Sequence, residues 1–116
     1  DGDPDLVLTQ CGAHAVILEN TRGVGHSITI GGLPVGARVV VKTSSGRSIV
    51  REAGPAPSYL GQCDPSVHVG LGGERAVSVT VQRRGRADQS LVIDPSPASD
   101  RVRLRSIGTK LERSPR

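Results

Sequence analysis

The chain has 116 residues and a formal charge of +4, and it contains one tyrosine but no phenylalanine, tryptophan or methionine. This length fits one domain with a modest core, and an apolar set of valine, leucine, isoleucine and alanine suits strands better than helices. No apolar run approaches the ~20 residues that a membrane-spanning helix needs, so we expect no such helix and no membrane partner.

The first residues combine regularly spaced acids with the start of a strand. Asp1, Asp3 and Asp5 alternate with other residues and include Gly2 between them. A calcium loop needs several oxygen ligands at short spacing and a glycine for its sharp turn. The segment resembles the latter half of the calcium loop of FG-GAP repeats, the blades of integrin-α-like propellers. The resemblance implies that Asp1 and Asp5 bind through their side chains and Asp3 through its backbone carbonyl.

The two acids that open such a loop would lie before Asp1. We therefore expect calcium in an intact parent protein and weak or no binding in this chain; the alternative is an acidic turn without metal. Residues 6–8 and 15–20 predict two strands of a hairpin, which on this resemblance ends a propeller blade. An isolated hairpin is marginal in water, so it must pack on the following domain or be poorly ordered.

Seven further strands are predicted from period-two alternation, with residues 20–25 as a linker before them. They span residues 27–30, 37–42, 47–52, 67–71, 76–82, 90–93 and 101–107. In the strand 76–82 the pattern places Val77, Val79 and Val81 inward. The predicted fold is an all-β, antiparallel β-sandwich or jelly-roll-like module. We assign residues 1–22 to the propeller blade, 23–107 to the module and 108–116 to a disordered tail.

Three ordered motifs carry a second resemblance. They are Gly36-Ala37-Arg38-Val39, Ser58-Tyr59-Leu60-x-Gln62-x-Asp64 and His68-Val69-Gly70-Leu71-Gly72. In this order they resemble the ASPIC/UnbV module, which is known from a secreted acidic cartilage protein and from bacterial proteins, some encoded near enediyne biosynthesis genes. The resemblance covers roughly residues 33–107, with Gly61 and Val69 departing from the usual serine and phenylalanine.

The stretch around the only tyrosine is the first candidate for ligand contact. Tyr59, Gln62, Asp64 and His68 would meet there if the loop lies beside the following strand. The alternative, which we favour, is that His68 makes a structural hydrogen bond that fixes the Tyr59 loop, with Tyr59 as a core anchor.

The cysteines and histidines allow three further hypotheses. Cys11 and Cys63 could form a disulfide in an extracellular context. Cys11-x-x-His14 and Cys63-x₄-His68 could supply a zinc site, although the spacing is loose. A Cys63 nucleophile with His68 and Asp64 would need a base beside the thiol. We favour ordinary loop residues over both chemistries and expect no enzyme.

Positive charge is concentrated in the second half of the chain, where residues 61–116 contain ten bases and six acids. The predicted basic surface consists of Arg83, Arg84, Arg86, Arg101, Arg103 and Arg105. Arginine alternates with apolar residues in 101–107, which predicts a last strand with one basic face at a sheet edge. An anionic partner or nucleic acid is one interpretation. We favour the other, a solvated face, because no nucleic-acid motif accompanies the charge.

The resemblances together imply a non-catalytic binding or interaction module. It would stand at the C-terminal end of an exported, extracellular FG-GAP propeller protein, with a protein partner or the upstream propeller as its neighbour. An alternative is an accessory small-molecule-binding protein in bacterial natural-product biosynthesis or self-protection, of the enediyne type. A second alternative is anion or nucleic-acid binding through the arginine strands.

Overall fold

The protein is described by a computed structural model that covers residues 4–21, 25–54, 66–93 and 101–114. All regular structure in these ranges is strand. The strands are β1 Leu6–Leu8, β2 Val16–Leu18, β3 His26–Gly31, β4 Arg38–Thr43, β5 Ser48–Glu52, β6 Val67–Gly72, β7 Ala76–Gln82, β8 Gln89–Val92, β9 Arg101–Ile107 and β10 Lys110–Arg113. The bounds of β1 to β9 lie close to those of the predicted strands, whereas β10 was not predicted.

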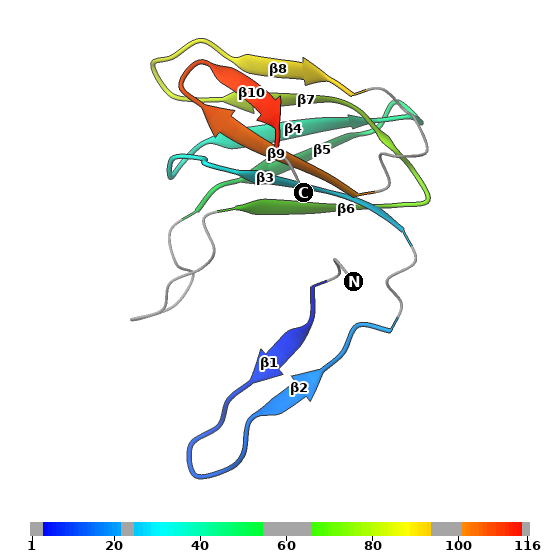
Figure 1. The fold of residues 1–116 in the computed structure, drawn as a ribbon, viewed down its shortest axis with the longest axis vertical. Coiled ribbons are helices and arrows are strands. Elements are labelled where there is room, and N and C mark those ends of the chain that lie inside the picture. The colour runs from blue at the N-terminus through cyan, green and yellow to red at the C-terminus, as the bar shows by residue number, and fades with distance from the viewer. Residues whose placement is uncertain (1–3, 22–24, 55–65, 94–100, 115–116) are drawn as a thin grey trace.

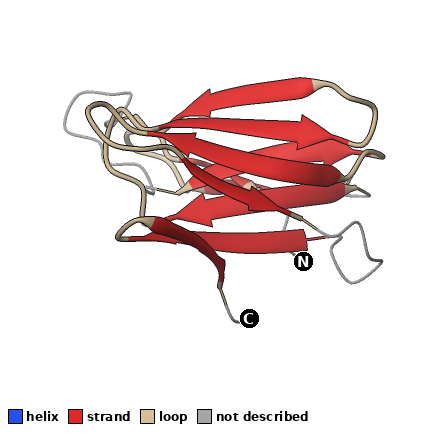
Figure 2. Ribbon diagram, turned by 90° about the horizontal axis from the view of Figure 1, so that it is seen from above, coloured by secondary structure: helices blue, strands red, loops and turns tan. Residues whose placement is uncertain are grey.

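Two four-stranded sheets form the body of the molecule. One has the order β10-β9-β3-β6 and the other β5-β4-β7-β8 (Figure 1). The pairs are antiparallel except that β9 runs parallel to β3, with Ile28 opposite Val102 and Ile30 opposite Leu104. The view from above shows the sheets stacked as layers (Figure 2). The prediction of an all-β sandwich is confirmed.

Alternation along the strands produces the core between the sheets. In β3 the side chains of Ile28 and Ile30 are fully buried, and in β4 those of Val39 and Val41 are fully buried. The remaining fully buried large side chains are Val69, Val79 and Val81. Each contributes about 1.5–3 kcal/mol relative to exposure, so β-branched residues stabilise this core without aromatic ones.

Val77 differs from the prediction that placed it inward. Lys42 pairs with Ser78, and the next residue of β4, Thr43, pairs with Ala76. Val77 is therefore the extra residue of a β-bulge, which reverses the alternation on its N-terminal side. Ala76 is buried and Val77 is 37% exposed. Alternation in sequence cannot reveal such a shift, because the extra residue is also apolar.

The predicted tail, residues 108–116, instead contributes a strand. A two-residue turn at Gly108 and Thr109 returns the chain as β10, with Lys110 opposite Ile107. Gly108 has φ +55°, a conformation that hairpin turns of this length require. Leu111 is 6% exposed and joins the core. One buried leucine among charged residues is a weak signal, which is why the strand was missed.

Because β10 covers it, β9 is not the sheet edge that we predicted. It lies between β10 and β3, where both of its sides are hydrogen-bonded. Val102 and Leu104 face the core, while Arg103 and Arg105 are exposed. The arginines thus cover the outer face of the sheet and do not protect an edge.

The β1–β2 hairpin is set apart from the sandwich (Figure 1). All six of its strand residues are apolar and exposed, from Val16 at 41% to Ile17 at 71%. Its open end is closed by the backbone N–H of Asn20, which donates to Asp5 Oδ1 at 2.9 Å. No helix long and apolar enough to cross a membrane occurs in the described residues.

Candidate binding cleft at one end of the sandwich

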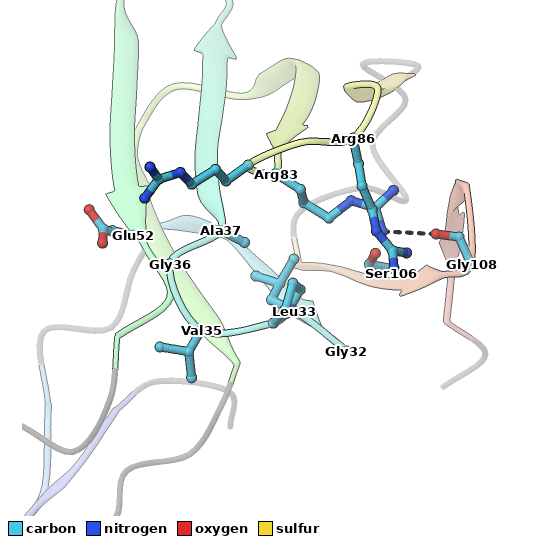
Figure 3. A pocket seen from close by; sticks show the side chains of 12 residues that line it. Gly32, Leu33, Val35, Gly36, Ala37, Glu52, Arg83, Arg86, Ser106 and Gly108 are labelled. Carbon is cyan, nitrogen blue, oxygen red and sulfur yellow. Dashed lines mark hydrogen bonds between the residues drawn. The ribbon is translucent and has the colours of Figure 1, made fainter.

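Three connections meet at one end of the sandwich and form an open cleft of about 880 Å³ (Figure 3). They are the β3–β4 loop, the β7–β8 turn and the β9–β10 turn. The lining residues are Gly32, Leu33, Pro34, Val35, Gly36, Ala37, Glu52, Arg83, Arg84, Arg86, Ser106 and Gly108. Loops on a rigid sandwich are common binding surfaces, because the sheets hold them in fixed positions.

The β3–β4 loop is held by backbone hydrogen bonds. Ala37 N donates to Pro34 O at 3.1 Å, and Gly36 N donates to Ala53 O at 2.6 Å. Gly36 has φ +80° at the third position of this four-residue turn, where a type II turn requires a positive φ. Val35 at the tip is 72% exposed. The loop is therefore a fixed wall with one apolar side chain at its tip.

The β7–β8 turn places three arginines around one glycine. Arg86 N donates to Arg83 O at 3.2 Å, and Gly85 has φ +71° at the third position of the turn. Arg83 is half-buried, whereas Arg84 and Arg86 are exposed. The labelled side chains of Arg83 and Arg86 extend toward the β9–β10 turn (Figure 3). A tight turn thus concentrates positive charge on one wall of the cleft.

A polar network fixes the opposite wall. Arg83 Nη1 donates to Gly108 O at 2.9 Å, and Gln89 Nε2 donates to the same oxygen at 3.0 Å. Ser106 Oγ donates to Gln89 Oε1 at 2.7 Å. Gln89 is only 3% exposed, so its amide connects β8 to the β9–β10 turn from inside the structure. These bonds hold the two sheets together beside the cleft.

The lining carries excess positive charge, with three arginines and one glutamate, Glu52. Arg84 and Arg86 make no ion pair within the described ranges. An ion pair does join Arg47 Nη2 to Glu74 Oε2 at 3.6 Å, at the other end of β4. The cleft arginines therefore keep their charge available to a ligand.

The carboxyl group of Glu74 lies in a local network at that other end. Its pKa is lowered chiefly by a hydrogen bond from the Thr43 side chain, with smaller contributions from Ser45 and the charge of Arg47, while burial opposes them. Thr43 Oγ1 also lies 3.2 Å from Arg47 O, which is a second acceptor for the same proton. This network ties the β4–β5 turn to the β6–β7 turn and does not reach the cleft.

A second depression, of about 350 Å³, lies on the outer face of the β10-β9-β3-β6 sheet. Arg103 and Arg105 line it, and it shares Gly32 with the main cleft. Gly32 has φ +70°, and a Cβ at this position would stand 2.7 Å from Ser106 O. The loop can pass this close to β9 only because Gly32 has no side chain, and this glycine lines both depressions.

The structure tests only part of the predicted ligand site. Tyr59, Gln62, Asp64 and Cys63 lie outside the described residues. His68 is half-buried on the outer face of β6, and a hydrogen bond of 3.0 Å joins its Nδ1 to Thr29 Oγ1 on β3. The histidine therefore has a structural partner in the neighbouring strand, which the sequence did not indicate.

The predicted metal ligands and disulfide are also only partly described. Asp1 and Asp3 lie outside the described residues, and Asp5 accepts the hydrogen bond from Asn20. Cys11 is exposed in the β1–β2 turn. Within the described ranges, no three histidine, cysteine or acidic side chains gather closely enough to hold a metal ion.

The predicted basic surface divides into two groups. Arg83, Arg84 and Arg86 line the main cleft, and Arg103 and Arg105 line the second depression. The backbone of Arg101 pairs with Ser27, but its side chain is outside the description. Sequence reasoning found these arginines from their density. It missed Gln89, Ser106 and Gly32, because a buried amide and a crossing loop depend on strand order.

Comparison with known protein families gave one match. The model of the family described as ASPIC and UnbV matches residues 33–110. This range begins within the β3–β4 loop, after Gly32, and ends at the start of β10, so it contains the β7–β8 and β9–β10 turns and most of the β3–β4 loop. No curated protein and no solved structure matched the chain.

Proposed function

The chain belongs to the ASPIC and UnbV family, and we propose that it is a non-catalytic binding module whose binding surface is the cleft at the end of the sandwich. The observation that carries this proposal is the construction of the cleft. Three hydrogen-bonded connections, from both sheets, surround one concave surface and present charged and apolar side chains to solvent. Such a preformed concave surface with a few placed polar groups is typical of a ligand site.

We further propose that this module follows an FG-GAP propeller in an exported protein. The β1–β2 hairpin supports this context, because its six apolar side chains are exposed on both faces. A two-stranded hairpin of this kind is marginal in water unless other structure covers it. A preceding propeller blade would supply that cover, and calcium would then bind in the blade, beside Asp5.

The binding role is tested by biolayer interferometry of the protein against immobilised extracellular polymers: a collagen, heparin, hyaluronan and neutral dextran. We expect reversible binding of at least one polymer, weakened by Arg84→Ala/Arg86→Ala. The control, Lys42→Ala/Arg47→Ala, removes the same charge from exposed residues outside the cleft; because Arg47 pairs with Glu74, thermal unfolding of the variant is measured beside it. If every interaction survives the cleft substitutions, the cleft is not the binding surface.

The propeller context is tested by calcium titration calorimetry on this chain and on a version extended upstream by about sixty residues, roughly the length of one further repeat. We expect binding in the extended protein alone, together with slower amide exchange in β1 and β2. Calcium binding to neither protein, or hairpin amides already protected in the short chain, would remove the propeller from the proposal while leaving the binding role intact.

A further inference from the structure

We propose that the ligand of the cleft is a sulfated polysaccharide, held by arginines of both depressions. This inference rests on the proposed function, because it requires the cleft to be the binding surface. It specifies the ligand as an extended chain that carries sulfate groups and is recognised through charge and hydrogen bonding.

The charge balance of the surface favours an anion. Arg83, Arg84 and Arg86 line the main cleft, and the second depression adds Arg103 and Arg105, whereas Glu52 is the acidic lining residue. Arg103 and Arg105 are also exposed and make no ion pair within the described residues. Arginine presents planar donors that bond two oxygens of an oxyanion at once. A sulfate ester offers that arrangement of oxygens.

The donors on one wall are already held in place before a ligand arrives. The hydrogen bond from Arg83 to Gly108 O fixes this side chain across the cleft, and the turn around Gly85 fixes the backbone of its neighbours. Less conformational freedom is then lost on binding than with arginines on a mobile tail. The arginines of the cleft are therefore preorganised for binding, unlike arginines on a charged face that is only solvated.

The layout of the two depressions favours a chain over a single small anion. They lie on either side of Gly32, one at the end of the sandwich and one on the outer face of the sheet. Gly31, opposite Arg105 on the neighbouring strand, lines the second depression without a side chain that would fill it. A ligand with repeated charges can occupy both places at once, whereas one sulfate ion can occupy only one.

The residue types of the surface argue against bases and neutral sugars. Single-stranded nucleic acids are held largely by stacking on aromatic side chains, and such side chains also serve as platforms for uncharged sugars. The sequence has a single aromatic residue, Tyr59, and it lies outside the described residues. A ligand bound through charge and hydrogen bonds needs many anionic groups and no stacking, and sulfated polysaccharides meet both conditions.

The test measures binding of a heparin dodecasaccharide by calorimetry at several NaCl concentrations. We expect Arg84→Ala/Arg86→Ala to weaken binding about tenfold near physiological salt, as the loss of two charge contacts predicts. The slope of log K against log[NaCl] should become shallower by about 1.5, because fewer counterions are released. Lys42→Ala/Arg47→Ala should change affinity less than twofold. Thermal unfolding of both variants checks that they are folded.

Two further ligands test which chemical groups the cleft recognises. Fully desulfated heparin should bind at least about tenfold more weakly than heparin, and a single-stranded oligonucleotide of equal charge should bind more weakly than heparin. Equal binding of the desulfated chain, or equal losses in both double variants, would overturn the inference. Tighter oligonucleotide binding that depends on Arg84 and Arg86 would also overturn it, yet would leave the cleft as the binding surface. If every polymer that binds is bound equally well by both variants, the proposed function itself is contradicted.

Discussion

The buried amide of Gln89 gives the sharpest test of how the cleft is held together. It accepts the hydrogen bond from Ser106 Oγ and donates to Gly108 O, so Gln89→Ala removes both bonds. A typical hydrogen bond contributes about 0.5–1.5 kcal/mol net, which predicts a loss of about 1–3 kcal/mol for the pair. Removing a side chain that is 3% exposed adds a small cavity, so we expect about 2–3 kcal/mol in total.

The assay is urea unfolding followed by circular dichroism, with thermal unfolding beside it. A loss of this size would lower the melting temperature by roughly 10 °C in a domain of this length. Ser90→Ala is the matched control in the same strand, because its hydroxyl makes an exposed hydrogen bond to Thr80 Oγ1. We expect that variant to stay within about 0.5 kcal/mol of the unchanged protein. A Gln89→Ala variant as stable as Ser90→Ala would show that the amide does not hold the β9–β10 turn.

Three other substitutions test particular features of the fold. Gly32→Ala should destabilise by about 2 kcal/mol or more, because its Cβ would stand 2.7 Å from Ser106 O at a positive φ; unchanged urea unfolding would refute that close approach. Leu111→Ala should cost about 2–3 kcal/mol if β10 packs on the core, and a neutral effect would restore the disordered tail. Glu74→Gln tests how stability depends on pH. The pKa of Glu74 is lowered, first by Thr43, so its charged form stabilises the fold above the ordinary carboxyl range, and this stability is lost as pH falls. Melting temperature against pH should therefore fall less steeply at acid pH in Glu74→Gln, and an identical slope would contradict this.

The strands could be predicted from sequence because burial follows alternation in most of them. Ile28 and Ile30, like Val79 and Val81, are separated by one residue and are fully buried. The exceptions occur where the pairing of one strand with its neighbour interrupts the period-two alternation. The bulge at Val77 depends on the register with β4, which a single strand does not encode.

The order of the strands within each sheet was the second feature that could not be predicted from the sequence. The alternation of arginine with apolar residues in β9 correctly indicates one exposed and one buried face. It does not tell whether another strand pairs on each side, and the short β10 has one apolar core residue, Leu111, to reveal it. The parallel pairing of β9 with β3 joins segments about seventy residues apart, and period-two patterns carry no information about that partner.

At the candidate site, likewise, the residue types could be predicted from the sequence but their positions in space could not. A basic second half is visible in the sequence, but there the arginines form a single group spread over residues 83–105. The fold separates them because the β7–β8 turn lies at the end of the sandwich, while Arg103 and Arg105 of β9 lie on the outer face of the other sheet. Gly32 lines both depressions and therefore connects the surfaces on which the two groups lie, and a Cβ at this position would stand 2.7 Å from Ser106 O. If the ligand spans both depressions, a change at this glycine should weaken binding without removing any charge, which no inspection of charge density along the chain would predict.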